Sequence, residues 1–396
     1  MIAQGCNRRT LALGLGAWVA GVGAARRVQA GGVGSPGRFE PIDLFADTRI
    51  FLRARINGVE VSALLDTGAE MTVVDTRLAS RLGLAAKGSG SAIGTGGSAS
   101  VSFADGVTIQ AAGLRLTDRT VAIIDLGAVA EAMGHPLPLL LGKDLLGGLV
   151  MDLDLPNRQI AFFPPSHAPK LPGATVLPFT QVGPLRAIPL RAASAEAALF
   201  HVDTGSGGAL DLYPAFSRKL GLPGDRAAST TLAGGVGGLA ESPILSLDQI
   251  AVGVTTLHEV PAILSSAGSA ATTEPVAGAI GMEVLSRFRL LADFQGDRLT
   301  LVGAPEALAK PFWKNTLGLA LMRTGDGVVV SHVMPNSPAA QTALTKGASI
   351  VSIDGARAST LTPPALRSLM GSPVGADVVV ATATHGEVRL RARVFY

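Results

Sequence analysis

Two aspartates, Asp66 and Asp203, are the residues of this sequence best placed to carry out acid–base chemistry. Each follows a short apolar segment and begins an Asp-Thr-Gly tripeptide, at residues 66–68 and 203–205. Hydrolysis without a metal or a covalent nucleophile needs one group that takes a proton from water and another that donates a proton. Two carboxyl groups held close together can do both, because like charges at short range cannot both ionise and the pair keeps one proton. The tripeptides therefore predict a hydrolytic pair, provided that the fold brings them together.

The two tripeptides belong to an internal duplication of the chain. Each is followed, in the same order, by a segment ending in Leu-Gly-Leu, a glycine-dense segment, an apolar segment and a closing pair of strands. The copies span residues 44–165 and 186–304, and we expect the Pro-rich connector at 166–185 to space two lobes. Facing copies related by a pseudo-two-fold axis bring equivalent residues together. We therefore expect Asp66 and Asp203 to meet between the lobes.

Glycines are expected to shape both the turns and the loops above them. Gly68 and Gly205 allow the tight turn that presents each aspartate. The 49 glycines, with only 4% aromatic residues, are typical of turn-rich β structure. Each glycine-dense segment is predicted to form a mobile hairpin loop, here called a flap. The flap glycines are Gly94, Gly96, Gly97, Gly234, Gly235 and Gly237.

The residue that follows the tripeptide differs between the copies. Ser206 follows the second tripeptide, whereas Ala69 follows the first. A serine hydroxyl can donate a hydrogen bond to Asp203 and favour its charged form, which alanine cannot do for Asp66. We therefore expect the shared proton to reside on Asp66, and we expect Ser206→Ala to raise the lower limb of a pH–rate profile.

Residues 63–69 and 140–146 resemble the two sequence motifs of retropepsins, Asp-Thr-Gly-Ala and an apolar-apolar-Gly-basic-polar-Leu-Leu run. The second copy, with Asp-Thr-Gly-Ser, resembles the pepsin type. The resemblance implies an all-β fold of two pseudo-symmetric retropepsin-like lobes. It also implies that Asp66 and Asp203 are the catalytic pair, that water is the nucleophile, and that the flaps cover an extended peptide. No cofactor is implied.

The same resemblance assigns supporting contacts. Thr67 and Thr204 would hydrogen-bond across the lobe interface. In retroviral proteases an acidic residue just after the first motif pairs with the basic residue of the second, and Glu70 and Lys143 hold these positions. The second copy lacks both charges, as expected of a structural brace, because a lone charge at a partly buried interface is costly. His201 is interpreted as a structural histidine, since the first copy has an apolar residue at the equivalent position.

The repeat ends near residue 310, and a third domain is predicted over 310–396. Strand-like runs at 327–333 and 349–355 flank a Ser-Pro-Ala turn, and a helix is expected over 362–370. This order resembles PDZ domains, which add a peptide as an extra strand and hold its terminal carboxylate on backbone amides. The expected amides are those of Leu317, Gly318 and Leu319. The alternative is a β-rich domain that packs permanently on the lobes without a ligand.

Residues 1–30 have the features of an export signal. Paired arginines precede an apolar run and a small-residue cleavage site that ends at Ala30, which resembles twin-arginine signals, with a general secretory signal as the alternative. We expect removal of this segment, export to the periplasm, a lead-in at 31–43 that lies loosely on the surface, and no stable membrane anchor. The net charge of +3 falls to −1 without the segment's four arginines, which excludes a basic surface for nucleic acid.

Two functions remain open at this stage. The first is an exported aspartic endopeptidase that acts as a monomer with an intramolecular pair of aspartates on protein or peptide substrates, while the PDZ-like domain binds peptide termini. The second is a non-catalytic exported protein that binds peptides in the protease-like groove and in the PDZ-like domain. Both carboxylates are retained, which favours the enzyme. The six histidines lack the spacing of metal ligands, so no metal is expected.

Overall fold

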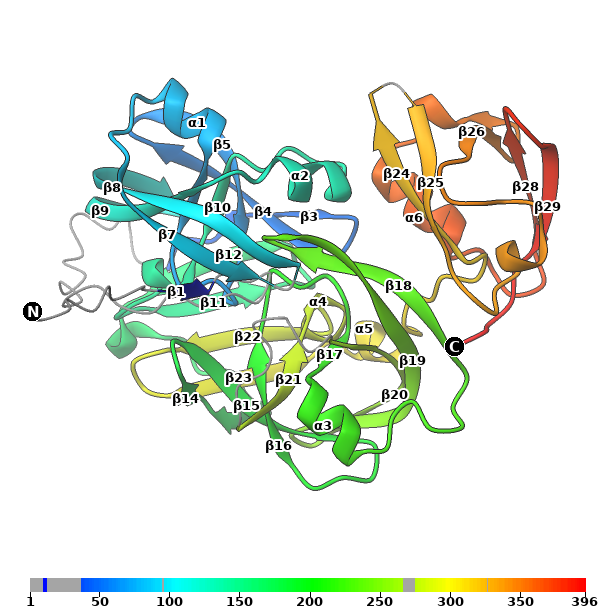
Figure 1. Ribbon diagram of the computed structural model, residues 1–396. Coiled ribbons are helices and arrows are strands. Elements are labelled where there is room, and N and C mark those ends of the chain that lie inside the picture. Colours follow the sequence, from blue (N-terminus) through cyan, green and yellow to red (C-terminus); the bar gives the residue numbers. More distant parts are fainter. Residues whose placement is uncertain (1–9, 13–36, 95, 266–274, 326) are drawn as a thin grey trace, which may run out of the picture.

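The computed structural model describes residues 10–12, 37–94, 96–265, 275–325 and 327–396. Three bodies follow one another along the chain (Figure 1): a first lobe in blue and cyan, a second in green and yellow, and a C-terminal domain in orange and red. Strands dominate all three, so the predicted all-β pair of lobes followed by an α+β domain is confirmed. None of the helices in these residues is long and apolar enough to cross a membrane.

The first lobe is built on a nine-stranded sheet with the order β1-β7-β8-β9-β6-β10-β5-β4-β3, and a further pairing of β8 with β4 closes it on itself. The turn from β4 to β5 is Asn57-Gly58, whose φ angles of 46° and 84° suit a two-residue hairpin. The elements of this lobe are β1 (Thr10–Ala12), β3 (Asp43–Phe45), β4 (Arg49–Ile56), β5 (Val59–Leu65), β6 (Val73–Asp75), α1 (Thr76–Arg81), β7 (Lys87–Gly94), β8 (Gly97–Ala111), β9 (Leu114–Ile124), α2 (Gly127–Met133), β10 (Leu139–Leu141) and the 3₁₀ helix η1 (Lys143–Leu145).

The second lobe repeats this plan in an eight-stranded sheet with the order β14-β15-β16-β21-β17-β20-β19-β18, closed by pairing of β15 with β19. Strands β15 to β20 match β4 to β9, and β21 matches β10, as the duplication predicts. The elements are β14 (Thr180–Val182), β15 (Leu185–Ala192), β16 (Ala198–Val202), β17 (Leu210–Leu212), α3 (Pro214–Lys219), β18 (Ala228–Gly235), β19 (Gly238–Val252), β20 (Thr255–Leu264), β21 (Val276–Ile280) and α4 (Met282–Leu285).

A six-stranded sheet with the order β13-β23-β22-β11-β12-β2 joins the two lobes. The closing strands of each copy meet at its centre, where β11 pairs antiparallel with β22. Its elements are β2 (Glu40–Pro41), β11 (Val150–Asp154), β12 (Gln159–Phe163), β13 (Thr175–Pro178), β22 (Phe288–Asp293) and β23 (Arg298–Gly303), and the short helix η2 (Pro165–His167) follows β12. One buried apolar cluster includes residues of both lobes and of this sheet, so the two copies share a core.

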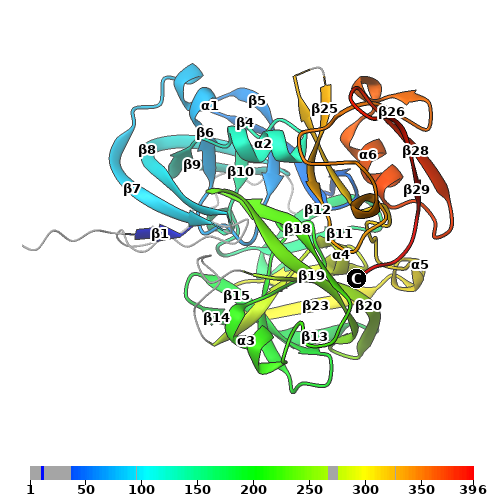
Figure 2. The same cartoon turned by 45° about the vertical axis from the view of Figure 1, so that its right-hand side comes forward.

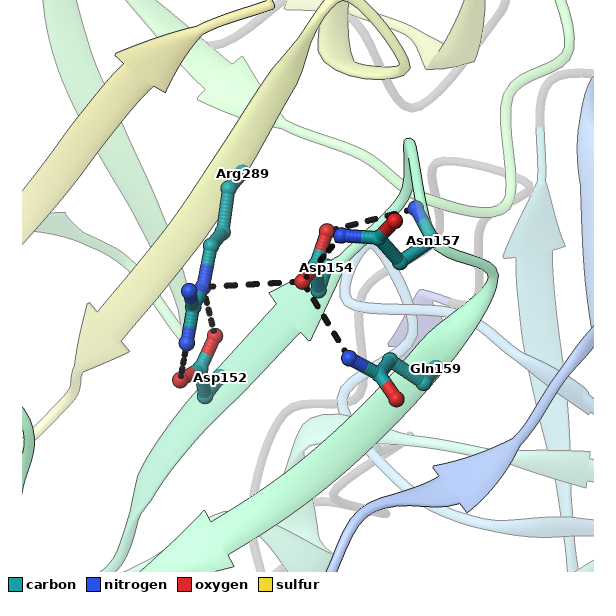
Figure 3. Close-up of polar contacts among 5 residues, drawn as sticks. All are labelled: Asp152, Asp154, Asn157, Gln159 and Arg289. Atoms are coloured by element: carbon teal, nitrogen blue, oxygen red, sulfur yellow. Dashed lines mark hydrogen bonds and ion pairs between the residues drawn. The ribbon is translucent and has the colours of Figure 1, made fainter.

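A two-bond ion pair connects the copies within this joining sheet (Figure 3). Arg289 on β22 donates from Nε and Nη2 to the carboxylate of Asp152 on β11, at 2.9 and 2.7 Å. The Asp152 side chain is fully buried. Asp154 lies 4.0 Å from Arg289 Nε and accepts hydrogen bonds from Asn157 and Gln159. The two partners of the ion pair come from different lobes. Loss of either partner would therefore leave an unpaired charge at the junction.

Replacing Arg289 with methionine should destabilise the junction of the lobes. The change leaves Asp152 as a buried charge without its partner, which costs about 3–5 kcal/mol. Arg226→Met is the matched control, because Arg226 pairs with Asp248 through the same two-bond geometry on the surface, where a pair contributes about 0–1 kcal/mol. Urea unfolding of both variants measures the difference, and equal losses of stability would contradict this account.

Two segments expected to lie outside the folded lobes take part in them. The lead-in supplies β2, which pairs with β12, and Ile42 is buried. The connector supplies β13, which pairs with β23, and β14, which pairs with β15. The expectation that the lead-in lies loosely on the surface is therefore wrong, because the edge strands of a sheet present free N–H and C=O groups that a neighbouring segment can satisfy. The connector also adds strands to two sheets.

The expected export signal, residues 1–30, lies mostly outside the described residues. Its residues Thr10–Ala12 form β1, which pairs in parallel with the flap strand β7. This pairing does not test the expected removal of the segment, which stays a prediction. Strand β7 would otherwise be the edge of the sheet, which explains why a free segment can pair with it.

The C-terminal domain has a sheet with the order β24-β25-β26-β28-β29, and β27 pairs with β26. The predicted strands at 327–333 and 349–355 are present, and α6 begins after Thr362, whose hydroxyl accepts a hydrogen bond from the N–H of Ala365. The elements are β24 (Leu319–Thr324), β25 (Gly327–Val333), η4 (Ala339–Gln341), β26 (Ser349–Ile353), β27 (Ala356–Arg357), η5 (Ala358–Thr360), α6 (Pro363–Met370), β28 (Asp377–Thr382) and β29 (Gly386–Arg391), and α5 (Pro305–Ala309) precedes them.

This domain packs on the flap strands of the second lobe and beside α2 of the first (Figure 2). His332 lies 2.9 Å from the Thr230 hydroxyl on β18, and Asn336 donates to the carbonyl of Ala228 at 3.1 Å. An apolar cluster is buried at the same contact and consists of Ile244, Met334, Phe395 and Tyr396. The domain therefore contacts the strands that carry the second flap.

Candidate active site

The fold brings the two Asp-Thr-Gly turns together between the lobes. Asp66 follows β5, and its N–H donates to the carbonyl of Leu141 at 2.9 Å. Asp203 follows β16 and donates in the same way to Ile280 at 3.1 Å. Each turn is thus held by the parallel neighbour of its strand, β10 in one lobe and β21 in the other. The two aspartates leave their sheets at equivalent points.

Four reciprocal hydrogen bonds lock the turns to each other. The N–H of Thr67 donates to the Thr204 hydroxyl at 3.0 Å, and the N–H of Thr204 donates to the Thr67 hydroxyl at 3.1 Å. The Thr67 hydroxyl donates to the carbonyl of Val202 at 2.7 Å, and the Thr204 hydroxyl donates to that of Leu65 at 3.0 Å. All of these groups are buried, so each bond satisfies a donor that would otherwise be costly. The contact between threonines that the resemblance implies is present.

Each carboxyl group packs against the glycine of the opposite turn. A Cβ atom on Gly68 would lie 2.6 Å from Asp203 Cγ, and one on Gly205 would lie 2.3 Å from Asp66 Cγ. Both aspartates are buried, at 0% and 3% exposure. Glycine is therefore needed at both positions for two reasons. It allows the tight turn, and it leaves room for the carboxyl group of the opposite lobe.

The surroundings place the shared proton on Asp66. Burial raises the pKa of Asp66 well above its ordinary value, and the nearby charge of Asp203 raises it further. Burial also raises the pKa of Asp203, but hydrogen bonds from the N–H groups of Ser206 and Gly205 counteract this. The charge of Arg49 also lowers the pKa of Asp203. The carboxyl of Asp66 accepts a hydrogen bond from the N–H of Gly68 at 2.9 Å, and its Oδ2 accepts none from the described residues. The pKa of Asp66 is therefore raised further than that of Asp203.

The expected role of the Ser206 hydroxyl is wrong. The backbone N–H of Ser206 donates to Asp203 at 3.0 Å, whereas the Ser206 hydroxyl donates to Asp211 at 3.2 Å. Asp211 lies on β17 beside the turn, and its carboxylate oxygen is the acceptor that draws the hydroxyl away. Ser206→Ala therefore leaves the hydrogen bonds to Asp203 in place, and its predicted effect on the lower limb of a pH profile no longer has a basis.

The six flap glycines lie in two hairpins that meet at their tips, in the middle of Figure 1. The hairpins are β7–β8 and β18–β19, closed by the pairs Gly94–Gly97 and Gly235–Gly238. A Cβ atom on Gly96 would lie 1.8 Å from the carbonyl oxygen of Gly238. A Cβ atom on Gly237 would lie 2.3 Å from the carbonyl carbon of Gly97, whereas Gly234 approaches Gly238 and Leu239 of its own hairpin. The tips therefore touch through backbone atoms, which side chains would prevent.

The Glu70 to Lys143 brace stays a prediction. The N–H of Lys143 donates to the carbonyl of Ala69 at 3.0 Å, so the two motifs are joined through the backbone. Burial lowers the pKa of Lys143, and the charge of Glu70 opposes this shift. The charge of Glu70 thus acts on Lys143, and their pairing as an ion pair is the part that stays a prediction.

His201 lies on β16 and is buried among the strands of the second lobe. Its Nδ1 lies 3.4 Å from the Tyr213 hydroxyl. Burial lowers the pKa of His201 to about 4, so the ring is neutral at higher pH. This agrees with a structural histidine.

A cleft of about 570 Å³ lies beside the second Asp-Thr-Gly turn, and all three bodies line it. The second lobe supplies residues 205–211 and 231–235, and the first supplies α2 and Arg49. The C-terminal domain supplies Met322 of β24 and Arg367 of α6. The candidate binding cleft is therefore asymmetric, because the C-terminal domain forms a wall at one end.

The PDZ-like loop differs from expectation at one of its three amides. The N–H of Gly318 donates to Asn315 Oδ1 at 2.7 Å within the buried loop, so it is engaged inside the domain. Leu317 and Leu319 are fully buried. Strand β24 is the edge of its sheet, and α2 of the first lobe lies beside it. The strand edge that a PDZ ligand would use therefore faces the protease lobes.

Two residues of the site were not predicted from the sequence, Arg49 and Asp211. Burial lowers the pKa of the Arg49 guanidinium, and the charge of Asp203 opposes this shift. Burial raises the pKa of Asp211 to about 6. Neither belongs to a motif, and only the strand pairing places them beside the pair of Asp66 and Asp203, here called the dyad. One feature of the sequence could have pointed to Arg49. The second copy has Gly207, which faces Arg49, where the first copy has the acidic Glu70.

Replacing Asp66 with asparagine should raise the stability of the protein at neutral pH. The pKa of Asp66 is higher in the folded state than its ordinary value of 3.8, so its contribution to stability is complete below that value and is lost as the pH rises through the folded pKa. Asparagine stays neutral and keeps the acceptor for Gly68. The melting temperature of the variant should exceed that of the wild type at pH 7, with a gain that shrinks toward pH 3. A gain independent of pH, or a loss at pH 7, would refute this.

Family models recognise each part of the chain. The aspartyl protease model matches residues 52–145 and again residues 188–284. The PDZ domain model matches residues 310–379. A search of the curated proteins found no match.

Three solved structures are similar to parts of the chain. An aspartic proteinase from Irpex lacteus is 15% identical with a TM-score of 0.43, and the alignment covers 69% of this chain and 98% of that one. A retropepsin-like aspartic protease from Rickettsia conorii is 18% identical with a TM-score of 0.26, covering 33% and 89%. Basic 7S globulin from soybean is 12% identical with a TM-score of 0.37, covering 67% and 94%. On the strength of the two family models, the chain carries the aspartyl protease domain twice, ahead of a PDZ domain.

Proposed function

We propose that this protein is an aspartic endopeptidase in which Asp66 and Asp203 activate a water molecule. The observation that carries the proposal is the contact of two buried carboxyl groups across the lobe interface, each against the opposite glycine. Such a pair holds one proton between two sites, which supplies an acid and a base in the same place. Both carboxyls come from one chain, so a monomer suffices.

The roles follow from the hydrogen bonds around the pair. Asp203, with two N–H donors, carries the negative charge and takes a proton from the attacking water. Asp66 carries the shared proton and gives it to the carbonyl oxygen of the peptide bond as the water oxygen bonds to the carbonyl carbon. The resulting gem-diol then breaks its C–N bond, and the amine leaves with the proton that Asp203 received. Asp66 takes back a proton from one hydroxyl of the gem-diol, whose oxygen becomes the carbonyl oxygen of the new carboxylic acid. The dyad returns to its singly protonated state.

The PDZ domain is proposed to bind peptide segments of the same substrates. A peptide added as a strand to the edge of β24 would face the protease lobes, beside α2 of the first lobe, and Met322 on that strand lines the cleft beside the dyad. A substrate held on β24 therefore continues toward the second Asp-Thr-Gly turn. We also propose that residues 1–30 direct export to the periplasm.

Separate changes of Asp66 and Asp203 to asparagine test the enzyme directly. Each removes one of the two proton-transfer groups, and loss of a general acid or base lowers the rate about 10²- to 10⁴-fold. The measurement is kcat/KM on a peptide library, with melting curves to show that the variants fold. Peptide binding without turnover in the wild type, unchanged in either variant, would instead support a non-catalytic peptide-binding protein.

A substitution in the PDZ edge tests the second role. Met322→Asp places a charge beside the proposed peptide strand and should raise KM several-fold for long substrates that reach β24, while short peptides keep their KM. Val351→Asp is the control, because Val351 is 50% exposed on β26 and does not line the cleft. Identical KM values for long substrates in the wild type and Met322→Asp would exclude this role.

A further inference from the structure

We propose that Arg49 binds a carboxylate group of the substrate, so that the cleft prefers peptides with an acidic group at one position beside the cleaved bond. This inference rests on the proposed peptidase function and adds a substrate class to it. Arg49 is the first residue of β4 and lines the cleft with the turn at 205–211.

The position of Arg49 depends on a glycine of the opposite lobe. A Cβ atom on Gly207 would lie 1.4 Å from Arg49 Nη1 and 2.3 Å from Cζ. The guanidinium therefore occupies the space that a side chain at position 207 would need. The equivalent residue of the first copy is Glu70, so the second copy has lost an acidic side chain at the place where a cation now lies.

The hydrogen-bonding groups of Arg49 are largely unused by the protein. Nη1 donates to the carbonyl of Thr48 at 3.0 Å, whereas Nε is buried without a hydrogen-bond partner in the described residues. No carboxylate of these residues lies within 4.0 Å of the guanidinium, although Asp211 lines the same cleft and is bonded to Ser206. A buried guanidinium without a paired anion is costly, and its planar set of donors matches a carboxylate.

The other arginine of the cleft shows the contrast. Arg367 forms an ion pair with Glu283 and stacks over Trp313, with Cζ 3.9 Å from the ring centroid. It is thus satisfied within the protein. Among the residues that the structure describes, Arg49 has no such ion pair. It also has no counterpart across the pseudo-two-fold axis, where strand pairing places Leu185. The cation marks one side of the dyad only, and a substrate carboxylate there would fix the direction in which the peptide lies.

A matched peptide series tests this assignment. A single Glu, or Gln in its place, is moved through each position on both sides of the cleaved bond, and one set ends in a free carboxylate while the other ends in an amide. The two sets separate a side-chain carboxylate from a terminal one. At one position the wild type should cleave the carboxylate peptide roughly 10- to 100-fold better in kcat/KM, the range expected for a charge-assisted hydrogen bond.

Two variants should abolish this preference. Arg49→Gln removes the positive charge. Gly207→Ala keeps the charge but displaces the guanidinium from its position. Arg53→Gln is the control, because Arg53 lies on the same strand with an exposed side chain and does not line the cleft, and it should keep the preference. Binding of the same peptides to Asp66→Asn, and to Asp66→Asn combined with Arg49→Gln, gives a readout that does not depend on turnover.

The outcomes separate this inference from the peptidase function. Turnover with equal rates for Glu and Gln peptides at every position overturns the role of Arg49 and leaves the peptidase standing. If Arg49→Gln lowers kcat/KM equally for all peptides and shifts the pH profile, Arg49 acts only on the pKa values of the dyad. That result also overturns its proposed role in binding a carboxylate. A binding preference that Arg49→Gln removes, without turnover in the wild type, supports the inference and overturns the peptidase. Absence of both binding and turnover overturns both.

Discussion

The structure depends on the close approach of two carboxyl groups across an interface that leaves no room for a Cβ atom. Gly68 and Gly205 allow this approach, and the hydroxyls of Thr67 and Thr204 hold the turns in register. Two buried carboxyls would repel each other if both were charged, so the site retains a proton where isolated aspartates would lose theirs. The proximity that destabilises the fully charged pair leaves one carboxyl protonated and the other charged. The proposed hydrolysis needs one carboxyl in each of these states.

The rest of the fold holds this contact in place. The joining sheet sets the lobes against each other through β11 and β22, and the buried Asp152 with Arg289 lies within that pairing. The C-terminal domain packs on the strands that carry the second flap. Its position also closes one end of the cleft.

The two lobes keep a symmetric backbone but differ in charge around the dyad. Asp211 stands where strand pairing places Val73 in the first lobe. Gly207 replaces the acidic residue that follows the first turn, and Arg49 fills the space. These differences lie on one side of the dyad, the side that the C-terminal domain lines. In the proposed mechanism, duplication supplies the two carboxyl groups that share a proton, and later divergence sets which of them carries it and the charge of the cleft.

The features predicted from the sequence were those that short segments determine. The tripeptides, the order of the repeated segments and the PDZ pattern each occupy a few consecutive residues, and these gave the dyad, the lobes and α6. Contacts between distant segments were missed. The pairing of β13 with β23, the Asp211 acceptor for Ser206 and the packing of Arg49 against Gly207 depend on strand register and lobe geometry, which no local pattern in the sequence specifies.

The proton shared by Asp66 and Asp203 is the central claim, and a carboxyl titration tests it most directly. Carbon NMR of protein labelled at aspartate, compared between the wild type and Asp203→Asn, assigns the pKa of Asp66 in each. The account predicts that Asp66 titrates well above the ordinary aspartate range in the wild type. It also predicts that removal of the Asp203 charge lowers this pKa. An Asp66 that titrates in the ordinary range, or that is unaffected by Asp203→Asn, would contradict the account.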